Sequence, residues 1–144
     1  MNPPTVMRDR KVVMVVEDDR PVGEILASII NDEEGYYAIH VTRPTEALET
    51  MKNVKPDLLV LDVNLPGMSG LELYDRVRGD DDLKRIPVMF ETALAREHRD
   101  DFKRRGIDDV LEKPFDLDEI VRCVHKLAPR DLNYSGNAGQ MPGI

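Results

Sequence analysis

Five polar residues stand at the ends of short apolar runs in the 144-residue chain, and their types suit phosphoryl chemistry. These residues are Glu17, Asp18, Asp62, Thr92 and Lys113. Carboxylates that lie close together repel one another unless a cation sits among them. Oxygen ligands with only a few acids suit Mg²⁺, which keeps some of its waters and bridges to phosphate oxygens. If the fold brings these residues together, they predict a Mg²⁺ site.

A carboxylate in such a group could itself receive a phosphoryl group. Carboxylates act as nucleophiles toward phosphorus, and phosphoryl transfer needs little beyond positioning and positive charge. Mg²⁺ and Lys113 would supply that charge, and the hydroxyl of Thr92 could donate a hydrogen bond to a phosphoryl oxygen. Taken singly, each residue also suits a solvated turn, a helix cap or a surface position, so the hypothesis depends on their convergence.

The apolar runs that precede these residues are expected to be strands. They cover residues 12–16, 38–41, 58–61, 88–90 and 110–111. Continuous apolar runs of this length are typical of parallel strands that are buried on both faces. The polar residues would therefore lie at the carboxyl ends of four parallel strands.

Helical patterns fill the intervals between the runs. Apolar stripes with spacings of three and four begin at Val22, Ala47, Leu71 and Leu117, and a strongly charged fourth helix is expected from about 96 to 105. Asp116 is placed to cap the last of these helices. Five strands that alternate with five helices predict a doubly wound α/β fold, with helices on both faces of a five-stranded parallel sheet. In such folds the functional crevice lies at the carboxyl ends of the strands.

Four segments of the chain resemble the receiver domain of response regulators, a family of two-component signalling. They are residues 15–19, 61–70, 87–93 and 106–115, and the resemblance runs from about Lys11 to Leu127. It implies a CheY-like, flavodoxin-like (βα)5 fold. It also implies a function in phosphorelay signalling, in which the domain is phosphorylated and then binds its partners differently.

The resemblance implies a role for each acidic residue. Asp62 would accept the phosphoryl group and also bind Mg²⁺. Asp18 would bind Mg²⁺ directly, and Glu17 would help through water. The backbone carbonyl of Asn64 would be a further ligand.

The resemblance also implies the remaining parts of the reaction. Thr92 would be the switch hydroxyl, Lys113 would contact the phosphate, and the Lys113–Pro114 peptide bond would be cis. The donor would be a phosphohistidine on a sensor histidine kinase or a histidine phosphotransfer protein. The recipient of the signal would be an effector protein or an output domain. The domain would catalyse only its own phosphorylation and dephosphorylation.

Three features depart from the family pattern. Val110 stands where an aromatic residue is usual, Glu91 stands where an apolar residue is usual, and the interval from Thr92 to Lys113 is about one residue short. A charge at position 91 that points into the site or onto the sheet would need a partner. The fourth helix is therefore expected to be shorter or shifted, and the switch to be unconventional. Leu94, which cannot orient an attacking water, favours slow self-dephosphorylation.

Composition limits the other classes of function. Hydrophobic residues make up 41% and charged residues 33%, which is ordinary for a globular domain. The net charge of -8 argues against direct binding of nucleic acid. No apolar run approaches the roughly 18 residues of a membrane helix, and the N-terminus lacks a secretory signal, so a cytoplasmic location is expected.

The sequence divides into a flexible lead-in over residues 1–10, a receiver domain over 11–128, and a flexible tail or truncated linker over 129–144.

Three alternatives to a phosphorylated receiver share the fold class. A phospho-independent interaction module would keep the fold and lose the switch. A phosphatase with an aspartyl-phosphate would want an acid at Asn64, and a flavodoxin would want a glycine-rich phosphate loop where Glu17 and Asp18 stand.

Overall fold

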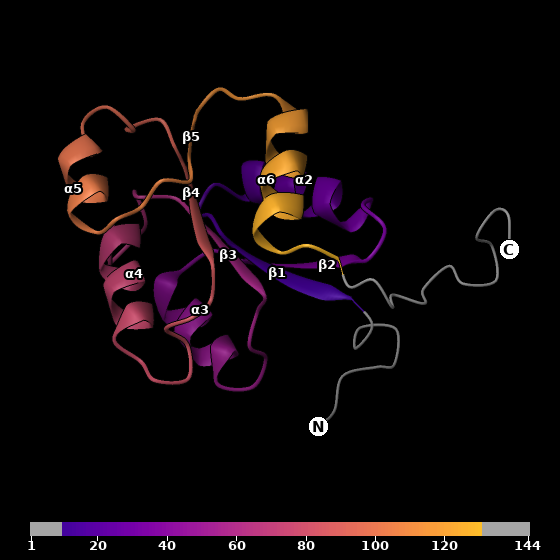
Figure 1. The fold of residues 1–144 in the computed structure, drawn as a ribbon, viewed down its shortest axis with the longest axis horizontal. Helices are drawn as coiled ribbons and strands as arrows, with labels where there is room; N and C mark the ends of the chain where they lie inside the picture. The colour runs from indigo at the N-terminus through magenta and orange to yellow at the C-terminus, as the bar shows by residue number, and fades with distance from the viewer. Residues whose placement is uncertain (1–9, 131–144) are drawn as a thin grey trace, which may run out of the picture.

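The computed structural model describes residues 10–130, in which a parallel sheet lies between two layers of helices (Figure 1). The strands are β1 (Lys11–Val16), β2 (Tyr36–Val41), β3 (Leu58–Leu61), β4 (Val88–Thr92) and β5 (Val110–Glu112). The helices are α2 (Arg20–Asn31), α3 (Pro44–Met51), α4 (Gly70–Arg78), α5 (Arg99–Arg104) and α6 (Leu117–Leu127). Most of the expected lead-in and tail, residues 1–9 and 131–144, lies outside the described residues.

The sheet has the strand order β2-β1-β3-β4-β5, and every pair is parallel. The order reverses between β1 and β3, which is where a doubly wound sheet opens a crevice at its carboxyl edge. The predicted fold class is therefore confirmed, and the strand order places the ends of β1 and β3 side by side.

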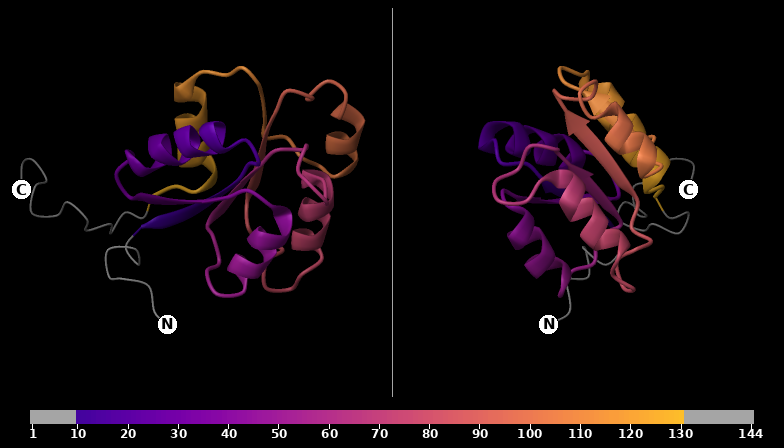
Figure 2. Two further views of the ribbon diagram at one scale, coloured as in Figure 1. Left: turned by 180° about the vertical axis from the view of Figure 1, so that it is seen from behind. Right: turned by 90° about the vertical axis from the view of Figure 1, so that its left-hand side faces the viewer.

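Each face of the sheet has its own apolar core, because neighbouring residues of a strand point to opposite faces. Met14 and Val16 pack with α3, α4 and α5, whereas Val13 and Val15 pack with α2 and α6. Figure 1 and the left view of Figure 2 show these two groups of helices on either side of the sheet. Burial on both faces explains why the strands have continuous apolar runs.

The N-cap predicted at Asp116 is confirmed, and Asp19 caps α2. Asp19 is the N-cap of α2, and its Oδ1 accepts a hydrogen bond from the backbone N–H of Val22 at 3.2 Å. Asp116 is the N-cap of α6, and its backbone N–H donates to Glu119 Oε1 at 3.0 Å. These caps fix where α2 and α6 start, just past the strand ends that carry the polar residues.

Two predicted starts were wrong by two residues or more. The fourth helix begins at Arg99 rather than near Arg96, because residues 93–98 form turns, one of them closed by a hydrogen bond from His98 N–H to Leu94 O. Strand β2 begins at Tyr36 rather than Ala38, because Tyr36 pairs with Lys11 in the sheet. The shorter fourth helix agrees with the short interval before Lys113.

Within residues 10–130, no helix has the length and apolar character that crossing a membrane requires.

Candidate functional site

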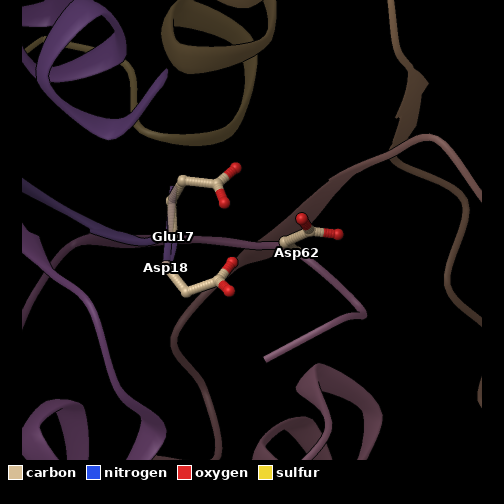
Figure 3. A group of neighbouring side chains, drawn as sticks. All are labelled: Glu17, Asp18 and Asp62. Atoms are coloured by element: carbon tan, nitrogen blue, oxygen red, sulfur yellow. The ribbon is translucent and has the colours of Figure 1, made fainter. Parts of the chain in front are cut away.

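The predicted polar residues meet at the carboxyl edge of the sheet. Glu17 and Asp18 follow β1, Asp62 follows β3, Thr92 ends β4 and Lys113 follows β5. Figure 3 shows the side chains of the first three extending from neighbouring strand ends. One carboxylate oxygen from each of these three acids lies within 4.8 Å of the others. The convergence that the fold class predicted is therefore present.

The three acids differ in their exposure to solvent. Glu17 and Asp62 are buried, with 1% and 7% of their surfaces exposed, whereas Asp18 is exposed. Partial burial and the neighbouring Glu17 carboxylate raise the pKa of Asp18, since both disfavour a further negative charge. Carboxylate oxygens crowded in this way, open to water on one side, fit a hard divalent cation such as Mg²⁺.

The backbone of Asp62 is held by a close approach of α4. Gly70, the first residue of α4, lies so near that a Cβ atom there would be 2.0 Å from the carbonyl oxygen of Asp62. The Gly70 N–H also donates to the carbonyl of Val63 at 2.8 Å. Only glycine leaves room for this contact, so the α4 start and the acid are positioned together.

Asn64 lies on the exposed side of the same loop. Its backbone N–H donates to Asp62 Oδ1 at 3.3 Å. The predicted use of its carbonyl as a metal ligand stays a prediction.

Lys113 brings the positive charge of the site into contact with three carboxyl groups. Its Nζ atom lies 2.9 Å from Glu17 Oε1, 3.2 Å from Asp62 Oδ2 and 3.0 Å from Glu91 Oε2. Burial alone would lower the pKa of Lys113, but the contacts with these carboxyl groups outweigh it and raise that pKa above its usual value. The side chain is therefore a fixed cation beside Asp62. The expected cis peptide bond joins Lys113 to Pro114.

Glu91 is a fourth acidic residue of the site. The sequence marked it as a departure from the family pattern that would need a partner if its side chain pointed into the site or onto the sheet. Its side chain in β4 is fully buried. Within the described residues neither of its carboxyl oxygens makes an aligned hydrogen bond, so its approach to Lys113 Nζ is a close contact without hydrogen-bond geometry. An acid directly after the apolar run 88–90 and before Thr92 was the signal that could have placed it in the site.

Burial raises the pKa of Glu91 to about 9, and the nearby Glu17 carboxylate adds to this effect. The pKa of Glu17 moves the other way. Burial opposes its ionisation, but Glu91, Lys113 and the Asp19 N–H together lower that pKa. The two shifts favour a protonated Glu91 beside a charged Glu17 near neutral pH.

Thr92 is fully buried at the end of β4. Its Oγ1 accepts a hydrogen bond from the Leu94 N–H at 3.0 Å, and its carbonyl accepts one from the Lys113 N–H at 2.9 Å. Since Oγ1 acts as an acceptor in the first contact, its own proton is left for another partner.

Val110 lies half-buried in β5, where the resemblance expects an aromatic residue. An open hollow of about 390 Å³ lies beside it, with Ala95, Phe102 and Ile107 among its lining residues. The smaller side chain thus coincides with open space between β5 and α5.

The chain matches one protein family and several known proteins. The sequence profile described as the response regulator receiver domain matches residues 13–125. The chain is 30% identical over 115 residues to the polar-differentiation response regulator DivK of Brucella anthropi, covering 79% of this chain and 93% of that protein. It is also 30% identical over 122 residues to hybrid signal transduction histidine kinase D of Dictyostelium discoideum, covering 84% of this chain but only 8% of that kinase.

Among solved structures, a putative response regulator from Chloroflexus aurantiacus superposes with a TM-score of 0.76 at 30% identity. The superposition covers 84% of this chain and 99% of that one. The profile match spans most of the chain and contains all the strand ends that build the site. The chain therefore belongs to the response regulator receiver domain family.

Proposed function

We propose that the chain accepts a phosphoryl group on Asp62 in a Mg²⁺-dependent reaction and then binds its partners differently. The observation that carries this proposal is the contact of Lys113 Nζ with Asp62 Oδ2 at 3.2 Å, beside the acidic cluster with Glu17 and Asp18. An acceptor carboxylate, a cation and a metal-binding group of acids are the parts that phosphoryl transfer requires.

Each residue of the site has a separate role in the phosphoryl transfer. An oxygen of Asp62 forms a bond to phosphorus while the phosphorus–nitrogen bond of the donor's phosphohistidine breaks, and the imidazole departs with that electron pair. The ammonium of Lys113 and the hydroxyl proton of Thr92 are offered to the phosphoryl oxygens. Mg²⁺, held by Glu17, Asp18, Asp62 and the Asn64 carbonyl, would supply positive charge beside those oxygens.

The proposal includes the partners and the setting expected from the sequence. The donor is a sensor histidine kinase or a histidine phosphotransfer protein, and the recipient is an effector protein or an output domain. The receiver domain spans residues 11–128 in the cytoplasm, and its chemistry is limited to its own phosphorylation and dephosphorylation. Leu94, half-buried and apolar two residues after Thr92, favours a slow loss of the phosphoryl group.

Intact mass spectrometry with Mg²⁺ and acetyl phosphate tests the proposal. The parent chain should gain one phosphoryl adduct, and the adduct should be absent from Asp62→Asn and from a Mg²⁺-free sample. Asp108→Asn, which removes an exposed acid away from the cluster, should keep the adduct. A folded parent chain without an adduct would favour the phospho-independent interaction module instead.

A further inference from the structure

The backbone at the metal-binding acids is held by a histidine from a different strand. His40 Nε2 lies 2.8 Å from the carbonyl oxygen of Glu17. Because a carbonyl can only accept, Nε2 carries the proton and donates. His40 is the next-to-last residue of β2, and the fixed direction of its hydrogen bond defines how the Glu17–Asp18 peptide is turned.

The sheet does not supply this hydrogen bond. Pairing between β1 and β2 ends at Val16 and Val41, and the Glu17 N–H still reaches the Val41 carbonyl at 3.0 Å. The carbonyl of Glu17 lies one step beyond the paired residues. The side chain of His40 therefore adds one hydrogen bond beyond the last paired residues. It does so at Glu17, where the acidic loop of residues 17–19 begins.

Gly23 in α2 makes room for the imidazole. A Cβ atom on Gly23 would lie 2.0 Å from His40 Nε2 and 2.3 Å from Cε1. Contacts this short cannot exist, so any larger residue must displace the ring or α2. The absence of a side chain at Gly23 is thus tied to the position of His40.

The other side of the acidic loop is fixed separately. The Asp19 N–H donates to Glu17 Oε2 at 3.1 Å, and Asp19 caps α2 through the Val22 N–H. The hydrogen bond of His40 holds the peptide between Glu17 and Asp18. Release of that peptide would change where Asp18 projects while leaving the strand and helix in place.

We propose that His40, in the space left by Gly23, is a positioning residue for the Mg²⁺ site. It acts through the backbone of Glu17 and Asp18, which supply two of the three clustered carboxylates. Groups that orient metal ligands typically change metal affinity 10–100-fold when they are lost. This inference rests on the proposed function, because it assigns the site to Mg²⁺.

Isothermal titration calorimetry with Mg²⁺ tests the role of His40. The dissociation constant should rise about tenfold in His40→Ala, the lower end of the range for outer-shell ligand partners. His40→Gln should recover most of the affinity, since its amide nitrogen can donate from a similar position. His98→Gln, a change at the start of α5 away from the acids, should bind Mg²⁺ as the parent does.

Gly23→Ala supplies a second test that separates positioning from folding. In the parent background it should weaken Mg²⁺ binding as much as His40→Ala, because the new methyl group displaces the ring. In the His40→Ala background the same change should leave Mg²⁺ affinity unaltered. There it should also raise the urea unfolding midpoint in EDTA, because alanine favours a helix over glycine.

Three results would overturn the inference. One is a His40→Ala protein with the parent's dissociation constant. Another is a Gly23→Ala effect of equal size in the parent and His40→Ala backgrounds. If His40→Ala fails to fold, His40→Ser, whose side chain is too short to reach the Glu17 carbonyl, serves as the background instead. A folded parent chain that binds no Mg²⁺ overturns the proposed function and this inference together, whereas the first two results leave the proposed function standing.

Discussion

Glu91 connects the interior of β4 to the chemistry at the sheet edge. Its carboxyl group is fully buried and meets Lys113 Nζ at 3.0 Å, on the same ammonium that contacts Asp62. A buried acid without aligned hydrogen bonds costs stability when it ionises. The contact with Glu91 therefore helps to hold the Lys113 ammonium beside Asp62. The contribution of Glu91 to the free energy of unfolding depends on pH.

Replacing Glu91 with Gln should make stability less dependent on pH. Burial raises the pKa of Glu91 from 4.5 to about 9, so the folded protein keeps a proton that the unfolded chain has lost. The parent's free energy of unfolding should consequently fall as the pH rises from 4.5 toward 9, and the Gln variant should lack this component. Urea unfolding in EDTA at several pH values measures the difference.

Glu112→Gln is the matched control for this experiment, because Glu112 is exposed at the end of β5. It should keep the parent's pH profile. The raised pKa of Lys113 does not disturb the comparison, since that contribution is fully present below the ordinary lysine pKa. Parallel pH profiles for the parent and Glu91→Gln would contradict the prediction.

The residues at strand ends were predictable, whereas those that act from inside an element were not. Parallel strands bring their carboxyl ends to one edge, so the order of Glu17, Asp62 and Lys113 along the chain was enough to place them together. His40 is one of three histidines spread along the sequence, and its bond to Glu17 depends on the register of β2 and on the space over Gly23. The spacing of residues along a sequence shows neither the register of the strand nor the space over Gly23.

Among the elements, α5 is the shortest helix of the described chain, and it is tied to α4 by one ion pair. Arg105 is the C-cap that directly follows α5. Its guanidinium donates through Nε and Nη2 to both carboxylate oxygens of Asp75, at 2.8 and 2.9 Å. Its Nη1 also donates to the Asp101 carbonyl at 3.0 Å. The link with Asp75 lowers the pKa of that acid. This two-point contact fixes the end of α5, whereas its start follows the turns after β4.

Removing this ion pair should destabilise the protein slightly. Arg105→Gln should lower the free energy of unfolding by about 0.5–1 kcal/mol, because the pair is partly exposed but bidentate. The loss should be smaller in an Asp75→Asn background, and urea unfolding of the four proteins gives the coupling energy. Lys103→Gln, at an exposed position of α5, is the control. Strictly additive effects of the two changes would argue against a working contact.

The elements themselves were largely predictable, and the misses concern their starts. Apolar runs identified all five strands and apolar stripes identified four of the helices, because each face of the sheet is covered, whereas the fourth helix was expected from a strongly charged segment. The start of α5 was wrong because the turns that precede it, over residues 93–98, depend on hydrogen bonds to Thr92 and Leu94 rather than on apolar spacing. The pair of Asp75 with Arg105 joins residues 30 apart in sequence, for which no local pattern exists.

For the molecule as a whole, the proposed Mg²⁺ site should make stability depend on divalent cations. Mg²⁺ at 100 times its dissociation constant should raise the free energy of unfolding by about 2.7 kcal/mol, because it binds the folded chain alone. The gain should vanish in Asp18→Asn, which removes an exposed acid of the cluster. Thermal unfolding with MgCl₂ or EDTA at equal ionic strength measures it.

Asp108→Asn serves as control here too, since it lowers the net negative charge equally at an exposed position outside the cluster. If both variants respond to Mg²⁺ like the parent, the stabilisation comes from general charge screening rather than from the site.

The direction of the strands also separates the site from the points where other sequence can be joined. The described chain starts β1 at Lys11, at the sheet edge opposite the acids. It returns to that edge through α6, where the carbonyl of Ala128 accepts a hydrogen bond from the hydroxyl of Tyr36 at the start of β2. A fusion partner or a surface tether attached at either point would begin on the far side of the molecule from Asp62. The same arrangement suits a module that makes up 93% of one relative and 8% of another.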